Sequence, residues 1–74
     1  MIKMNKIFSK RSQLSFIHEL GILLSTNISM LESLEIIYKM EKDKKRKHAL
    51  QNIVSNIKKG ISLSNSLINK ELGF

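Results

Sequence analysis

Two helix-start signals, one at Ser29 and one at Ser62, constrain the fold of this chain more than any other sequence feature. At the first, the Ser29 hydroxyl can accept a hydrogen bond from the backbone of Glu32 while the Glu32 carboxylate bonds back to the Ser29 amide, which is a capping box. At the second, Gly60 can end a helix in the left-handed conformation, and Ser62 can cap the next helix. The two signals divide the chain into short helices.

The composition favours a small all-α domain with a marginal core. Proline is absent and glycine occurs only three times, so the main breakers of helices are scarce. A chain of 74 residues buries only about 60% of the surface that its unfolded form exposes. With no cysteine, a disulfide cannot supplement this core. No apolar run approaches the roughly 20 residues of a membrane span, and the basic N-terminus lacks the apolar segment of a secretory signal, so we expect a cytoplasmic domain.

Apolar spacing predicts a first helix over about residues 12–26. Its predicted core stripe recurs at three and four residues, with Phe16 and Leu23 flanking it, and comprises Leu14, Ile17, Leu20 and Leu24. Residues 1–12 are basic and apolar without a clear period, which predicts a frayed or partly helical lead-in. Asn27 is predicted to end the first helix, because asparagine tolerates the left-handed conformation better than other non-glycine residues.

Three more helices are predicted downstream, each with a cap and an apolar face. The second runs from Ser29 to about Met40, and its apolar face comprises Leu31, Leu34, Ile37 and Tyr38. The third is capped by Asp43 and stops at Gly60, with an apolar face of Leu50, Ile53, Val54 and Ile57. The fourth starts at Ser62 and is predicted to bury Leu63, Leu67 and Ile68. The short loops predict an antiparallel bundle of about four short helices.

Two stretches of the chain resemble the type II secretion F family, the inner-membrane platform proteins of type II secretion, type IV pilus and competence machines. Residues 16–34 read F-I-H-E-L-G-I-L-L-S-T-N-I-S-M-L-E-S-L, where the family has F-T-R-Q-L-A-T-L-L-x-A-G-V-P-L-L-E-A-L. Among the residues that agree are Leu20, Leu23, Leu24, Leu31, Glu32 and Leu34. Residues 60–67 read G-I-S-L-S-N-S-L, similar to the family's G-x-S-L-S-x-A-L, and share Gly60, Ser62, Leu63, Ser64 and Leu67 with it. Asn27 replaces a family glycine and Ser29 a family proline, and both replacements preserve the turn.

The resemblance implies that residues 13–74 form the first part of a cytoplasmic bundle of about six helices, truncated after the fourth. It implies a full-length integral protein of the inner membrane, with this soluble part on the cytoplasmic side. The implied role is a non-enzymatic scaffold that couples a cytoplasmic assembly ATPase to other inner-membrane components of the machine. Because the apolar stripes are wider than four short helices need, we expect a homodimer or a swapped oligomer.

A basic run between the second and third helices is the one candidate interaction patch, and it comprises Lys42, Lys44, Lys45, Arg46 and Lys47. With a net charge of +7, the chain could use it to hold phosphates, anionic lipid or an acidic protein. The plainer interpretation is a solvated face at a helix junction. The alternative function is a small basic helical nucleic-acid-binding protein. It is less favoured because Glu32 and Glu35 lie where a recognition helix would meet phosphates, and because stacking aromatics are missing from the run.

The sequence predicts no catalytic residue, metal ligand or cofactor site. His18 and His48 lie on different predicted helices without an acidic or thiol companion at ligand spacing. Glu19 and Glu32 could approach across the first hairpin and share a cation, but capping already accounts for Glu32. The serines lie where caps are needed, and the chain has no glycine-rich phosphate loop.

Overall fold

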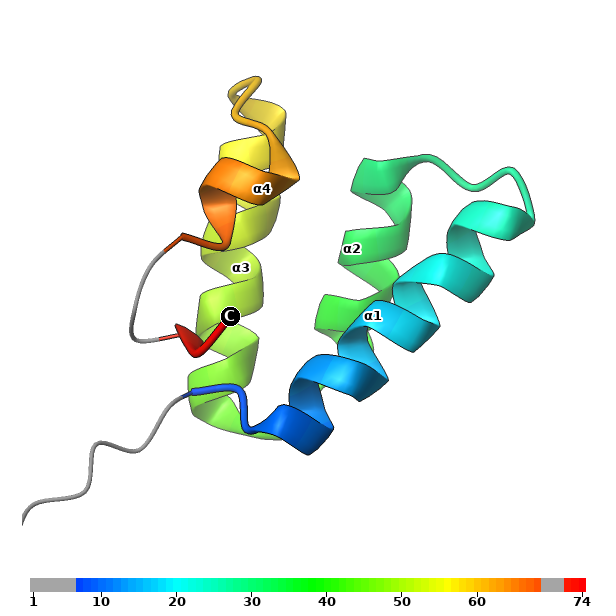
Figure 1. The fold of residues 1–74 in the computed structure, drawn as a ribbon. Helices are drawn as coiled ribbons and strands as arrows, with labels where there is room; N and C mark the ends of the chain where they lie inside the picture. The colour runs from blue at the N-terminus through cyan, green and yellow to red at the C-terminus, as the bar shows by residue number, and fades with distance from the viewer. Residues whose placement is uncertain (1–6, 69–71) are drawn as a thin grey trace, which may run out of the picture.

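The computed structural model describes residues 7–68 and 72–74, which form four helices joined by turns. These are α1 (Lys10–Ser25), α2 (Met30–Met40), α3 (Lys44–Lys58) and α4 (Leu63–Ser66). Successive helices reverse direction, with α1 packed on α2, α2 on α3, and α3 on α4 (Figure 1). The predicted all-α class with four short helices is therefore confirmed.

Each helix begins at a side chain that accepts a backbone N–H three residues ahead. These caps are Ser9, Ser29, Asp43 and Ser62. The Ser29 hydroxyl lies 3.1 Å from the amide of Glu32, but within the described residues the Glu32 carboxylate makes no return bond to Ser29. The capping box is thus half formed. Asn27 (φ 65°) and Gly60 (φ 89°) adopt the left-handed conformation that the sequence predicts at these helix ends.

The start of α1 differs from the sequence prediction. The helix begins at Lys10, ahead of residue 12, because Ser9 caps it. Phe8 is only 2% exposed, and its N–H donates to the Leu72 carbonyl at 2.8 Å. The Gln13 side-chain amide donates to the carbonyls of Phe8 (3.1 Å) and Gly73 (2.9 Å). These four residues form a terminal clasp that holds Phe8 in the core. Residues 7–12 are partly helical, which is one of the two predicted alternatives for the lead-in, whereas residues 1–6 lie outside the described residues.

One apolar cluster forms the core, and it contains side chains from α1, α2 and α3 and from the segments at Phe8 and Leu72. Leu34 of α2 and Leu50 of α3 are fully buried. The remaining buried apolar side chains are Phe8, Phe16, Leu20, Ile37, Ala49, Ile53, Val54 and Leu72. The rings of Phe8 and Phe74 lie 5.1 Å apart between centroids, and each lies within 5.8 Å of Phe16, which are favourable tilted aromatic contacts. The predicted apolar faces of α2 and α3 therefore pack inward.

The predicted core faces of α1 and α4 need correction. Of the four residues in the α1 stripe, only Leu20 is buried, because α1 packs through Phe16 and Leu20 and leaves the far side of its wide apolar band uncovered. Leu14 is 72% exposed, and Ile17 and Leu24 are also exposed. In α4, Leu63 and Leu67 are half-buried, but Ile68 is 70% exposed because the helix is a single turn that ends before it.

Two buried serines allow a test of what a buried hydroxyl group contributes to the free energy of unfolding, with and without a hydrogen-bond partner. The Oγ atom of Ser33 is fully buried and has no hydrogen-bond partner among the described residues. Replacing Ser33 with alanine should raise the free energy of unfolding by about 1 kcal/mol, since a buried hydroxyl without a partner costs roughly that much. Urea denaturation followed by circular dichroism measures the change.

Ser66 is the matched control. It is also buried, but its hydroxyl donates to the Ser62 carbonyl at 3.0 Å. Replacing Ser66 with alanine removes a hydrogen bond that is made and should lower the free energy of unfolding by about 0.5 to 1 kcal/mol. The family stretches that this chain resembles have alanine at both positions. If both variants lose the same free energy of unfolding, the Ser33 hydroxyl does have a hydrogen-bond partner.

Candidate interaction site

The predicted basic patch splits into paired and free cations. Arg46 forms an ion pair with Glu41, with 3.2 Å between Arg46 Nε and Glu41 Oε2. Lys47 Nζ lies 4.9 Å from the centroid of the Tyr38 ring, which is a cation–π contact. The side chains of Lys42, Lys44 and Lys45 are exposed. Three of the five predicted patch residues are therefore available on the surface, while two are engaged within the fold.

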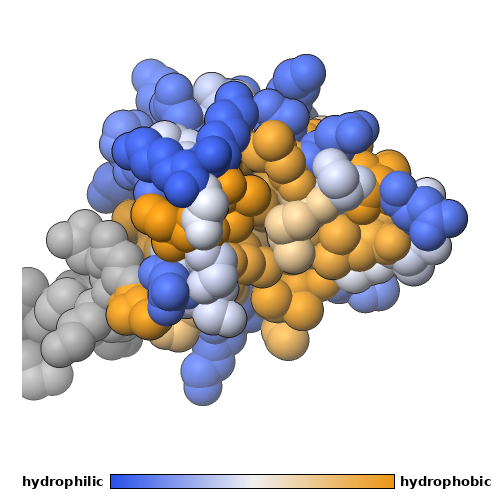
Figure 2. All heavy atoms as spheres, turned by 90° about the horizontal axis from the view of Figure 1, so that it is seen from above, coloured by the Kyte–Doolittle hydropathy of each residue, from blue (hydrophilic) through white to orange (hydrophobic). Residues whose placement is uncertain are grey.

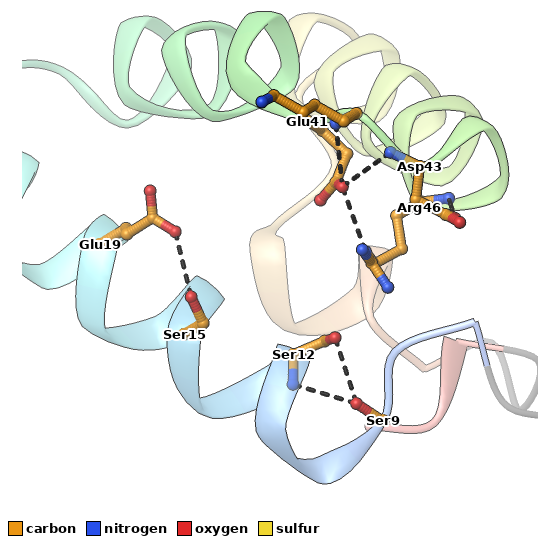
Figure 3. A network of polar contacts seen from close by, with 8 residues as sticks. Ser9, Ser12, Ser15, Glu19, Glu41, Asp43 and Arg46 are labelled. Atoms are coloured by element: carbon orange, nitrogen blue, oxygen red, sulfur yellow. Dashed lines mark hydrogen bonds and ion pairs between the residues drawn. The ribbon is translucent and has the colours of Figure 1, made fainter.

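Glu41, which the sequence analysis did not single out, organises the junction between α2 and α3. One carboxylate oxygen accepts from the backbone N–H groups of Lys42 and Asp43, both at 3.1 Å, and from Arg46 Nε (Figure 3). These three donors to one oxygen hold the turn in place and fix the position of the Arg46 side chain. The sequence does carry a signal for this contact. Glu41 lies at the end of one helix, and Arg46 lies in the first turn of the next helix, close enough along the chain to pair with it.

A cleft of about 480 Å³ lies between α1 and the α2–α3 junction. Its walls carry Ser12, Ser15 and Glu19 of α1 on one side and Glu41, Lys42 and Arg46 on the other. Figure 3 shows Ser12, Ser15 and Glu19 on one side of the gap and Glu41 and Arg46 on the other. Its apolar lining comprises Phe8, Phe16, Ile37 and Met40, and Arg11 contributes a further cation.

The opposite side of α1 carries an exposed apolar strip that we call the outer face, made of Leu14, Ile17, Gly21 and Leu24. The spacing of three, four and three residues places them on one side of a helix that turns about 100° per residue. An added Cβ at Gly21 would meet no atom within 4 Å. The outer face therefore lacks a partner among the described residues.

A second apolar area lies at the end of the molecule that carries the α1–α2 and α3–α4 turns. Viewed from this end, apolar atoms gather across the middle and hydrophilic residues surround them (Figure 2). Leu24 at the end of α1 and Ile61 in the α3–α4 turn are exposed there by 37% and 39%. The uncovered apolar surface thus continues from the outer face toward this end.

The structure does not gather the other polar candidates into a site. His18 and His48 are exposed on α1 and α3, and Glu32 is exposed in the first turn of α2. Glu19 accepts a hydrogen bond from Ser15 at 3.2 Å. Across residues 7–68 and 72–74, no three acidic, histidine or cysteine side chains are placed to hold a metal ion.

The sequence motif residues serve the fold. Leu20 and Leu34 lie in the core, and Leu31, Leu63 and Leu67 pack against it. Leu24 departs from this pattern, since it is exposed on the outer face.

The arrangement defines a small helical-bundle domain with capped helices and uncovered apolar surface. None of the helices in the described ranges is both long and apolar enough to cross a bilayer. A family model described as type II secretion system (T2SS), protein F, matches residues 16–74, and the chain belongs to this family. Its members are structural platform components of secretion systems and are associated with the inner membrane. Comparison with curated proteins and with solved structures finds no significant match.

Proposed function

We propose that this chain is a non-enzymatic scaffold module on the cytoplasmic side of an inner-membrane platform protein. In this role it binds a second copy of itself and couples a cytoplasmic assembly ATPase to a secretion, pilus or competence machine. Family membership supports the platform assignment. The observation that carries the binding role is the outer face of α1, where large apolar side chains are exposed at regular helical spacing.

The outer face has the properties of a helix-pairing surface. Leu14 and Ile17 expose 72% and 51% of their surfaces, and a spacing of three and four residues is the spacing of side chains that interdigitate between paired helices. A glycine inside a helix costs about 1 kcal/mol relative to alanine, and nothing within the protomer uses the space at Gly21. The missing side chain would allow the backbone of a second helix to approach closely.

A second copy of α1 is the occupant that this surface fits best. The strip is apolar at all four positions, and a twofold axis would place each large residue of one copy against the other copy. Such pairing covers the side of α1 that the terminal clasp and α2 leave open. The exposed Lys42, Lys44 and Lys45 lie on a different part of the molecule, so an acidic surface of an assembly ATPase could contact them in the paired state.

The replacement of Ile17 with aspartate tests the pairing. The dimer dissociation constant should rise at least about tenfold, because each copy would bring a charge into an apolar contact. Ile22 is the matched control, since it is also 51% exposed on α1 but lies about 140° around the helix from Ile17. Its replacement with aspartate should leave the dimer intact. Sedimentation equilibrium over a range of concentrations measures both constants, and a wild-type chain that stays monomeric at high concentration would refute the pairing.

A further inference from the structure

We propose that the cleft between α1 and the α2–α3 junction binds a short acidic and apolar segment of a partner protein. Arg46 would pair with a carboxylate of that segment, while the exposed Met40 would contact a neighbouring apolar side chain. The inference rests on the proposed role as a protein-binding scaffold. It concerns the side of α1 that lies opposite the outer face, so the two surfaces can be tested separately.

Arg46 is held in a position to receive a carboxylate. Its Nε atom is bonded to Glu41, and its side chain lies in the wall of the cleft, on the side that faces α1 (Figure 3). No other hydrogen bond of this side chain is present among the described residues. A guanidinium group carries five N–H donors in a planar fork, and four of them lie on the terminal nitrogens. A carboxylate entering the cleft can therefore form the paired, two-bond contact that arginine favours.

Glu41 holds the Arg46 side chain in position when no ligand is bound. The Glu41 oxygen that accepts from Arg46 also accepts from two backbone N–H groups, so the carboxylate cannot turn away without breaking three bonds. The Arg46 side chain is only 31% exposed, which places it in the wall of the cleft and not on the outer surface. A side chain already fixed in place loses little conformational freedom on binding, which favours affinity.

The charges and the floor of the cleft define the chemistry of the ligand. Three cationic side chains, Arg11, Lys42 and Arg46, line the cleft with two anionic ones, Glu19 and Glu41, so one positive charge remains to be balanced. Phe16 and Ile37 form the floor and are only 3% and 5% exposed, so most of the apolar surface open to a ligand belongs to Met40, which is 63% exposed and can adapt its shape. The volume of about 480 Å³ lies within the range of binding pockets. A carboxylate flanked by apolar side chains satisfies these features together.

A peptide segment fits this cleft better than a lipid headgroup does. The exposed Lys44 and Lys45 do not line the cleft, and a flat anionic membrane would reach them before the recessed Arg46. Membrane binding is therefore kept as an outcome that the experiment must distinguish.

The test titrates the isotope-labelled chain with two blocked peptides, Ala-Leu-Asp-Leu-Phe-Ala and the same peptide with asparagine in place of aspartate. Nuclear magnetic resonance should show the largest shifts at residues that line the cleft, with the aspartate peptide bound at least about fivefold more tightly. Arg46→Gln should abolish this difference, and Arg46→Lys should restore only part of it, because an ammonium group lacks the fork. Lys45→Gln removes the same charge from the neighbouring residue outside the cleft and should leave the difference unchanged.

Several results would overturn the proposal. These are equal affinity for the two peptides, an aspartate preference that survives Arg46→Gln, and acetate ion alone giving the same shifts at the same affinity. Arg46-dependent binding to vesicles of equal parts phosphatidylcholine and phosphatidylglycerol, without a peptide preference, would assign the cleft to lipid instead. The Ile17→Asp variant separates this inference from the pairing proposal. If that monomeric variant keeps the aspartate preference, the cleft is supported whatever happens to the dimer. If the preference is absent while the wild-type dimer is intact, the cleft proposal alone fails.

Discussion

Replacing Leu50 with alanine is expected to lower the free energy of unfolding by about 3 to 4 kcal/mol. Leu50 is fully buried in α3, the helix that packs against both α2 and α4, so its removal leaves a cavity at the centre of the fold. Domains of this length have a total stability of about 4 to 11 kcal/mol, and the change would remove a large share of it. Urea denaturation at low protein concentration measures the loss.

Leu14 offers the same chemical change at an exposed position. It is 72% exposed on α1, so Leu14→Ala should change the free energy of unfolding of the monomer by less than about 0.5 kcal/mol. Both variants remove the same atoms from a helix, so the difference between their losses of unfolding free energy reports the effect of burial. Similar losses at the two positions would contradict the core that the structure assigns to α3.

The replacement of Phe8 with alanine should cost about 3 kcal/mol. Phe8 is 2% exposed and contacts the rings of Phe16 and Phe74, although it lies before the first helix. The expected loss is at the low end for a buried phenylalanine, because Phe8 lies outside the helices and its segment can rearrange more freely than the middle of α3. Thermal unfolding followed by circular dichroism measures the change.

Phe74→Ala is the matched control for Phe8. The Phe74 ring belongs to the same cluster but is 37% exposed, so its loss should cost about 1 to 2 kcal/mol. If Phe8→Ala costs less than Phe74→Ala, residues 7–9 behave as the frayed lead-in that the sequence predicts.

Apart from the start of α1, the helix boundaries could be predicted from the sequence because each depends on residues within about four positions. The caps at Ser29, Asp43 and Ser62 and the left-handed residues Asn27 and Gly60 all occupy their predicted places. A cap satisfies backbone groups in the first turn of its own helix, so distant contacts have little influence on it. Local chemistry was sufficient for this part of the fold.

The buried side of α1 could not be predicted in the same way. Apolar residues cover a wide band of this helix, and periodicity reveals the band but not the part of it that meets a neighbour. The part of the band that becomes buried is determined by Phe8 and Phe74, whose rings contact Phe16 from segments that lie outside the helices. These residues show no periodic signal, and Phe74 is 58 positions away from Phe16 along the chain (74 minus 16).

The basic run was predicted as a cluster of charges, whereas its division into free and paired side chains was not. The division depends on the contacts of Lys47 with Tyr38 and of Arg46 with Glu41, which the sequence analysis did not single out. The cleft has the same origin, since α1 and the α2–α3 junction meet only in the folded chain. Its arginine was visible in the sequence, whereas the place of that side chain in the wall of a cleft was not.

The terminal clasp has a mechanical consequence. Gln13 bonds to Gly73 across 60 positions of sequence, and the Phe8 amide bonds to the Leu72 carbonyl. A pull applied at Phe74 is therefore transmitted directly to the first turns of α1 through these bonds and the stacked rings. The force reaches the helix that carries both the cleft and the outer face without first stretching α2 and α3.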